Sequence, residues 1–176
     1  MSVLGLTISV NGKEDGDAFQ HMQYACERAG AELVNVGRYV FPKLLPLFEA
    51  QEAQQFDEEG VGPHGSWAPL SAKYAAWKEA HYPGKPILQR SGNLKEALTS
   101  SSSPLARRTV SDSELVFGTI GVPYATVHFV SNGNRPARPP VDFGSDIDVD
   151  VRKAMLSGVR EAVKDLDEYF DLSGLA

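Results

Sequence analysis

Hydrophobic and polar residues alternate at the start of the chain and then change to a helical spacing. Between residues 2 and 12 the apolar side chains of one face are Leu4, Leu6, Ile8 and Val10. Alternation with a period of two is typical of a strand with one buried face. The dipeptide Asn11-Gly12 follows as a turn signal, so we expect the strand to end there.

The next apolar residues recur every three or four positions, which predicts a long helix. This seam consists of Phe19, Met22, Cys26, Ala29, Leu33, Val36 and Val40. The seam suits a helix packed on its own chain, and it equally suits a helix that meets its equivalent in a neighbouring subunit. Pro42 is expected to end or kink the helix because proline lacks the donor N–H. A second helix is then expected to run to about Glu58, with Pro46 in its first turn.

Shorter elements fill the middle of the chain. Ser71 and Ser91 are each placed to cap a short helix, and Leu94 and Leu98 form a buried pair four residues apart in the second one. Two antiparallel strands are predicted over 107–111 and 114–120, joined across Asp112-Ser113. A short helical or turn segment is expected from Tyr124 to Val127.

Flexible loops are expected near 58–66 and 131–146, where glycine, proline and asparagine are frequent. A closing helix is expected from Asp148 or Asp150 to about Phe170, and we expect the chain to fray after residue 171. Its predicted buried stripe is Met155, Val159, Ala162, Leu166 and Tyr169.

Together these patterns predict a single α+β domain over residues 1–176. We expect a small, mainly antiparallel sheet made from the N-terminal strand and residues 107–120. It should pack against the long N-terminal helix and the C-terminal helix.

Composition limits the environment and the partners. No signal peptide is recognisable at the N-terminus and no apolar run is long enough to span a bilayer, so no membrane partner is expected. The single cysteine, Cys26, allows no intrachain disulfide, and we expect it to be buried as a small apolar residue.

Charge is unevenly distributed along the chain. Residues 71–110 carry seven basic and two acidic side chains, whereas residues 142–171 carry four basic and nine acidic ones. Segments of opposite sign can steer copies of one chain into head-to-tail contact, although they also suit solvated helix faces. The net charge of −6 argues against nucleic acid as the main partner.

The sequence offers no catalytic, metal or cofactor signature. His64 and His81 flank the helix after Ser71 but lack a third ligand nearby. The acidic run from Asp142 to Asp150 lacks the glycine and the distal glutamate of a calcium loop. The glycine-rich loop over 60–65 lacks the Gly-Lys-Ser/Thr ending of a phosphate loop. We therefore expect neither an enzyme nor a bound cofactor.

Two islands of residues remain, and they carry a family resemblance. The first is Gly65-Ser66-Trp67-Ala68-Pro69-Leu70-Ser71, followed by Tyr74, Lys78, Ile87-Leu88 and Ser91-Gly92-Asn93-Leu94. The second is Tyr124-Ala125 with His128, Gly133 and Pro136-Ala137-Arg138-Pro139. In this order and spacing they resemble the phage virion morphogenesis family, the Mu-like tail completion proteins, over roughly residues 50–160. The segment from Pro140 to Gly144 departs from that family, which usually continues with Phe directly.

The resemblance implies a structural protein of the virion neck. Such a protein assembles as a ring, expected to be hexameric, around the DNA channel, and the DNA passes through without sequence-specific binding. Its implied neighbours are the tail terminator or tail tube protein and the head-closure or connector protein. Assembly would take place in the host cytoplasm, and the product would reside in the virion.

Candidate residues follow from the islands. Tyr124, His128, Arg135 and Arg138 are the candidates for an interface, where an arginine fork could bind carboxylates of a neighbour. Arg138 could equally bind the acids over 142–150 of its own chain. The expected structural anchors of the first island are Trp67, Pro69, Leu70 and Tyr74.

Two other functions stay open. Within the same class, the protein could be the tail terminator that caps the tail tube. From another class, it could be a small nucleic-acid-binding module that uses the basic segment 73–108.

Overall fold

The computed structural model describes residues 9–10, 13–14, 18–60, 65–133, 135–141 and 145–164. Within this part of the chain there are five α-helices, one 3-10 helix and two separate antiparallel sheets of two strands each. The elements are β1 (Ser9–Val10), β2 (Lys13–Glu14), α1 (Ala18–Val34), α2 (Gly37–Asp57), α3 (Ala72–His81), α4 (Asn93–Thr99), β3 (Ala106–Val110), β4 (Leu115–Thr119), η1 (Thr126–His128) and α5 (Ser145–Ala162). The predicted α+β class is confirmed.

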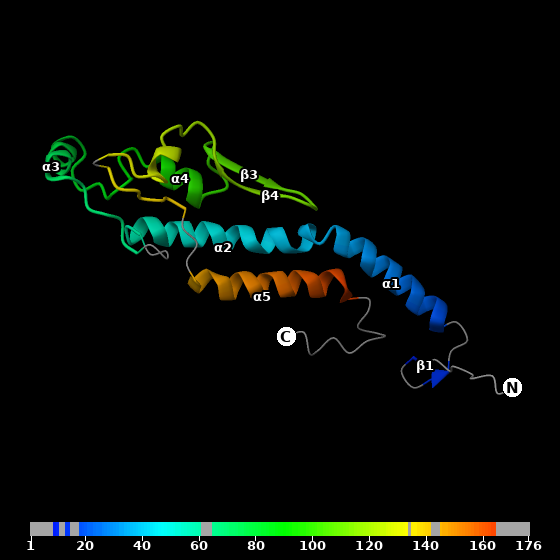
Figure 1. Cartoon of the computed structure of the whole chain (residues 1–176). Coiled ribbons are helices and arrows are strands. Elements are labelled where there is room, and N and C mark those ends of the chain that lie inside the picture. The colour runs from blue at the N-terminus through cyan, green and yellow to red at the C-terminus, as the bar shows by residue number, and fades with distance from the viewer. Residues whose placement is uncertain are drawn as a thin grey trace.

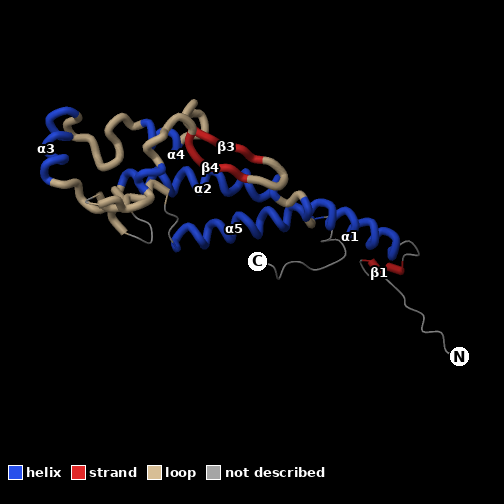
Figure 2. The backbone as a smooth tube through the Cα atoms, turned by 45° about the horizontal axis from the view of Figure 1, so that its top comes forward, coloured by secondary structure: helices blue, strands red, loops and turns tan. Residues whose placement is uncertain are grey.

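Helix α2 is the axis of the molecule. Its 21 residues span about 30 Å at 1.5 Å per residue. Figure 1 shows α5 along one side of α2 and the β3–β4 hairpin with α4 along the other. Helix α1 extends beyond one end of α2 and α3 lies beyond the other, and Figure 2 shows the same order from a second direction. The molecule therefore has two dissimilar ends.

The β3–β4 hairpin forms as the sequence predicts. Ala106 pairs with Thr119 and Val110 with Leu115, so the turn falls at Asp112-Ser113. The hairpin rests on α2 and α4. Its tip reaches the start of α2, where the backbone oxygen of Asp112 would lie 2.3 Å from a Cβ built on Gly37. Only glycine allows this close approach.

Arg108 of β3 joins the hairpin to both helices beneath it. Its Nε lies 3.2 Å from Glu49 Oε1 of α2, and both side chains are largely buried. Its Nη2 donates to the carbonyls of Ala97 and Leu98, which lie in the last turn of α4. A guanidinium at a helix C-terminus satisfies carbonyls that lack intrahelical partners. Its Cζ also lies 4.0 Å from the centre of the Phe117 ring.

The described end of the predicted N-terminal strand, Ser9 and Val10, does not join this sheet, which corrects the prediction for these residues, and residues 2–8 lie outside the described residues. β1 pairs only with β2, in the register Ser9 with Glu14 and Val10 with Lys13. The Asn11-Gly12 signal favours a local two-residue hairpin, and a local partner costs less entropy than a distant one. Figure 1 shows β1 beside the outer end of α1, far from β3 and β4.

Pro42 does not end the first helix, and Pro46 does not lie in the first turn of the second, which corrects both predictions. Pro42 and Pro46 both lie inside α2. They are exposed and four residues apart, so the carbonyls that they leave unbonded lie on the solvent side, where water can bind them. The interruption falls earlier, at Asn35-Val36, where Arg38 N donates to Asn35 O over three residues instead of four.

The buried face of α1 agrees with the predicted seam at Ala29 and differs from it elsewhere. Ala25 and Ala29 are buried, whereas Cys26 and Leu33 are exposed. The predicted burial of Cys26 is therefore wrong. Helix α1 contacts α5 much less than α2 does. The predicted seam positions Phe19 and Met22 have side chains outside the described residues.

Helix α5 begins at Ser145, earlier than predicted, and turns its smallest residues toward α2. A Cβ built on Gly158 would lie 2.5 Å from Val40 Cγ2 and 3.1 Å from the carbonyl carbon of Tyr39. Because Gly158 sets this contact, Met155 points to solvent, which corrects its predicted place in the buried stripe. The remaining stripe residues Val159 and Ala162 are half-buried and buried, and Leu166 and Tyr169 lie outside the described residues.

The main core lies where the end of α2, α4 and the loops meet. Its fully buried members are Phe56, Trp67, Leu94, Ala97, Leu98, Val122 and Ala125. The predicted pair Leu94 and Leu98 is thus confirmed. This core is the base on which both islands rest.

Candidate functional site

The two islands, about 70 residues apart in sequence, are bonded to each other at the end of α2. The indole Nε1 of Trp67 donates to the carbonyl of Pro139 at 3.1 Å. In the opposite direction, Arg138 Nε donates to Ala68 O at 2.7 Å and its Nη2 donates to Pro69 O at 2.8 Å. These reciprocal bonds make one rigid unit of two loop segments.

Trp67 reaches this position because of a left-handed turn after α2. Gly60 has φ +105°, and a Cβ there would lie 2.6 Å from Trp67 N. The Trp67 N–H donates to Glu59 O, and the Trp67 ring meets Phe56 edge-on with centroids 5.4 Å apart. Glycine is required at this turn because a side chain would displace the tryptophan.

Arg138 is an internal clamp, which corrects its predicted place at a subunit interface. Arg138 is only 6 % exposed, and its partners among the described residues are backbone carbonyls. Burial lowers the pKa of its guanidinium, and the positive charge of Arg135 lowers this pKa further. Arg135 lies beside it, half-buried, and its Nε has no hydrogen-bond partner among the described residues.

The first island holds its predicted anchors in unequal environments. Trp67 is buried in the core, whereas Leu70 is half-buried. Pro69 is exposed and contributes its carbonyl to Arg138. Tyr74 is 41 % exposed and stacks on Trp77, with ring centroids 5.5 Å apart. Tyr74 therefore borders an open surface instead of the core.

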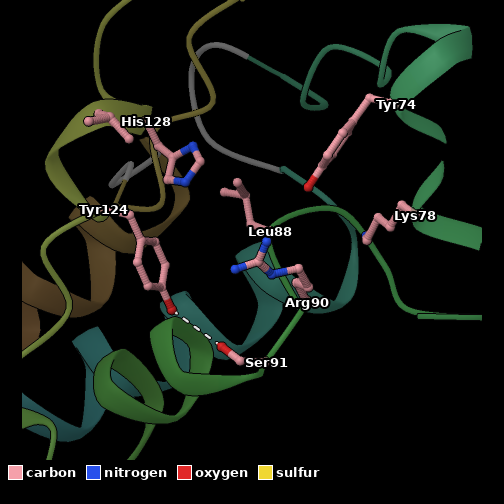
Figure 3. A pocket seen from close by; sticks show the side chains of 8 residues that line it. Tyr74, Lys78, Leu88, Arg90, Ser91, Tyr124 and His128 are labelled. Atoms are coloured by element: carbon pink, nitrogen blue, oxygen red, sulfur yellow. Dashed lines mark hydrogen bonds between the residues drawn. The ribbon is translucent and has the colours of Figure 1, made fainter. Parts of the chain in front are cut away.

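A pocket of about 230 Å³ opens between the joined islands. Figure 3 shows its walls, which come from α3, from the loop before α4 and from the segment around η1. The lining residues are Tyr74, Lys78, Leu88, Arg90, Ser91, Tyr124, Val127 and His128. Among the described residues, no aspartate or glutamate lines this pocket.

Lys78 closes one side of the pocket while bonded to the backbone. It is the buried residue of α3, and its Nζ donates to the carbonyls of Lys85 and Pro86. Burial lowers the pKa of Lys78, and the charges of Glu59 and Glu79 act in the opposite direction. Its ammonium group therefore holds the turn after α3 and has little capacity left for a ligand.

Tyr124 and His128 form the opposite wall. Their rings meet edge-on with centroids 6.3 Å apart, and the Tyr124 hydroxyl lies 3.4 Å from Ser91 Oγ. His128 is half-buried. Its pKa is lowered by burial first and then by the charges of Arg135 and Arg138, so the neutral ring is favoured.

Arg90 is the pocket's available cation, and no motif of the sequence singles it out within the basic segment 73–108. Its Cζ lies 5.6 Å from the centre of the Tyr82 ring, and no carboxylate among the described residues pairs with it. Figure 3 shows its guanidinium directed into the space between Leu88 and Tyr124. Leu88 has φ +59°, a conformation that turns the chain sharply just before Arg90.

An exposed apolar surface adjoins the pocket. Val127, Phe129 and Val130 follow one another around η1, and Val130 is 61 % exposed. Ile120 is also exposed at the end of β4. Contiguous exposed apolar side chains often mark a contact with another protein.

The described residues contain no group of three His, Cys, Asp or Glu side chains that could hold a metal ion. Asp148 and Asp150 pair with Arg152 and Lys153 on the same helix, and His64 lies outside the described residues. No helix in the described ranges combines the length and apolar character needed to cross a membrane.

Comparison of the chain with protein-family models, with curated proteins and with solved structures finds no match. The family resemblance thus rests on the residues of the two islands and on their order in the chain. Those residues meet in space, because Trp67, Pro69, Arg138 and Pro139 bond to one another.

Proposed function

We propose that this protein is a structural component of a phage virion at the head–tail junction. In this role it is a tail completion or neck protein, a ring subunit that joins tail to head around the DNA channel. It performs no catalysis and needs no cofactor. The proposal is supported by the ordered series of motifs from Trp67 to Pro139.

One observation carries this proposal furthest: the joined islands present a fixed apolar surface. The bonds of Trp67 and Arg138 hold the loops in place, and Val127, Phe129 and Val130 stay exposed on them. A surface held rigid before binding loses little entropy on association. Such a surface suits a permanent contact between subunits better than it suits turnover of a substrate.

Basic side chains gather on one side of the molecule. The segment 71–110, with seven basic and two acidic side chains, includes α3, α4 and β3, whereas α5 is close to neutral, with four acidic and three basic side chains. Figure 1 shows α4 and β3 on one side of α2 and α5 on the other. Unlike faces of this kind generate a ring when the rotation between neighbours closes.

The nucleic-acid alternative loses support from the same side chains. Three of the seven cations in segment 73–108 are already engaged within the chain: Lys78 with carbonyls, Arg108 with Glu49 and carbonyls, and Lys95 with Asp57. Phosphate binding needs several free cations on one face. The tail terminator role stays open as the second candidate because it would use the same kind of ring.

The experiment is deletion of the gene from the phage or prophage that encodes it. Electron microscopy of the lysate should show full heads and complete tails that are not joined, and plasmid expression of the wild-type protein should restore whole virions. Tails of irregular length would indicate the terminator role instead. Normal yields of infectious particles from the deletion would overturn the proposal.

A further inference from the structure

The pocket between the islands has the chemistry of a carboxylate site. Arg90 supplies a guanidinium with five N–H donors, and the hydroxyls of Ser91 and Tyr124 lie beside it. Leu88 and Val127 supply apolar contacts for the stem of a side chain. Since no carboxylate of the described residues lines the pocket, none of them compensates the charge of Arg90 there.

The size of the pocket limits the ligand. About 230 Å³ is below the roughly 300–1,000 Å³ of sites for drug-sized ligands. The pocket therefore suits one or two side chains better than a nucleotide or a sugar. One guanidinium beside a His128 ring that favours its neutral form matches a single carboxylate better than a doubly charged phosphate.

Two exposed carboxylates among the described residues lack a partner. Every other exposed or half-buried acid whose side chain the structure describes has a hydrogen bond or an ion pair, and Glu52 is buried within the fold. The exceptions are Asp112 and Glu114, which are exposed at the tip of the β3–β4 hairpin. The tip thus presents two exposed carboxylates next to the start of α2.

The tip and the pocket lie at opposite ends of α2. Asp112 contacts Gly37, the first residue of α2. The pocket loop is bonded to the last turn, where Gln89 Nε2 donates to Phe56 O at 2.8 Å. The length of α2, about 30 Å, separates them, so the tip of one chain cannot enter its own pocket.

We propose that the Asp112–Glu114 tip of one copy docks in the Arg90 pocket of the next copy. This contact rests on the proposed ring and names the residues that would close it. A guanidinium fork binds one carboxylate through two parallel bonds, which fixes the angle between neighbours. The acidic tip and the pocket lie at opposite ends of α2. Each subunit therefore uses its tip once and its pocket once, as a closed heterologous ring requires.

The test uses two variants of the full chain with matched controls. Arg90→Gln removes the cation of the pocket, and Arg107→Gln makes the same charge change at an exposed position of β3. Asp112→Asn with Glu114→Gln neutralises the tip, and Asp148→Asn with Asp150→Asn neutralises two exposed acids of α5. Native mass spectrometry at low salt reports the stoichiometry of each.

Both test variants should weaken self-association about 10- to 100-fold, whereas both controls should assemble like the wild type. An equimolar mixture of the two test variants, one labelled with ¹⁵N, gives the sharpest result. The intact tip of the pocket variant can enter the intact pocket of the tip variant, so the mixture should form heterodimers and stop there. Circular dichroism of each variant checks that it is folded.

Three results would overturn the contact: assembly of both test variants like the wild type, no heterodimer in the mixture, or a wild type that stays monomeric up to millimolar concentration. None of these decides the proposed function, which depends on whether the protein is needed to join heads to tails. Unjoined heads and tails in the deletion together with unaffected variants would leave the function standing and remove this contact.

Discussion

Arg138 shows how one side chain can define the geometry of a loop unit. Its backbone N–H donates to His128 O while its guanidinium donates to Ala68 O and Pro69 O. Two other segments of the chain are thus tied to this one residue. The parallel Nε–H and Nη2–H donors of a planar guanidinium can bind adjacent carbonyls in this way, whereas the single ammonium of lysine cannot reach the same carbonyls together.

Replacement of Arg138 by Lys should therefore destabilise the fold by about 1–3 kcal/mol, because buried carbonyls lose their donors. Urea denaturation followed by tryptophan fluorescence measures this, and the spectrum should also report a less rigid Trp67. Arg152→Lys, at an exposed position of α5, serves as the control and should stay within about 0.5 kcal/mol. Equal stability of both variants would show that the clamp contributes nothing.

His128 predicts a specific dependence of stability on pH. Its pKa in the folded protein lies below the ordinary value of about 6.5, chiefly because of burial. The unfolded chain therefore binds a proton at a higher pH than the folded one. The contribution of His128 to the free energy of unfolding is fully present above its pKa in the unfolded chain. It is lost as pH falls through its pKa in the folded protein.

The measurement is the free energy of unfolding between about pH 7.5 and pH 4.5 for wild type and His128→Gln. The difference between the two curves should shrink or change sign below about pH 6.5, because glutamine carries no titrating group. Curves that stay parallel over this range would contradict the lowered pKa of His128.

At the scale of elements, Gly158 decides how α5 lies on α2. The built Cβ distance of 2.5 Å to Val40 Cγ2 is shorter than real side chains tolerate. Gly158→Ala should therefore destabilise the protein by about 1–3 kcal/mol through overpacking. Gly30→Ala is the control: a Cβ there meets nothing within 4 Å, so helix propensity should raise stability by about 0.5–1 kcal/mol. Thermal unfolding that ranks the two variants in the opposite order would contradict this packing.

Arg108 has the corresponding role for the hairpin. Its ion pair with Glu49 is largely buried, and it satisfies the end of α4. Arg108→Ala should cost about 3–5 kcal/mol, since Glu49 would be left without its main partner. Arg107→Ala, one position away and exposed, should change stability by no more than about 0.5 kcal/mol. If urea titrations gave the two variants the same midpoint, Arg108 would not be the residue that holds the hairpin on α2 and α4.

Elements governed by local signals could be predicted from the sequence. The hairpin follows from alternation around Asp112-Ser113, and α3 begins where Ser71 accepts a bond from Tyr74 N. Elements that depend on tertiary contacts could not be predicted from the sequence. Gly158 determines the buried face of α5 through a contact with Val40, and no periodicity in α5 alone contains that information.

The same distinction between local signals and tertiary contacts holds for the residues of the candidate site. Tyr124 and His128 were expected to share a surface, and the structure places both in the wall of the pocket. Arg138 was assigned to an interface because a free arginine near acids usually seeks a carboxylate. Its actual partners are carbonyls of a loop 70 residues away, which only the folded arrangement of two loops brings within reach.

At the scale of the whole molecule, the two dissimilar ends of α2 are the central feature. One end presents the acidic hairpin tip, and the other presents the pocket and the exposed apolar residues Phe129 and Val130. A subunit with unlike ends polymerises in one direction and closes into a ring if the angle allows. This asymmetry is what the proposed neck role requires of its subunit.

The most direct test of that role is to locate the protein in purified virions. A copy with a short C-terminal epitope, first shown to restore infectious particles to the deletion phage, is labelled with gold-conjugated antibody and viewed by electron microscopy. The account predicts label at the junction of head and tail in most particles, with none along the tail or on the head shell. Particles that lack the protein, or that carry it only elsewhere, would contradict the account.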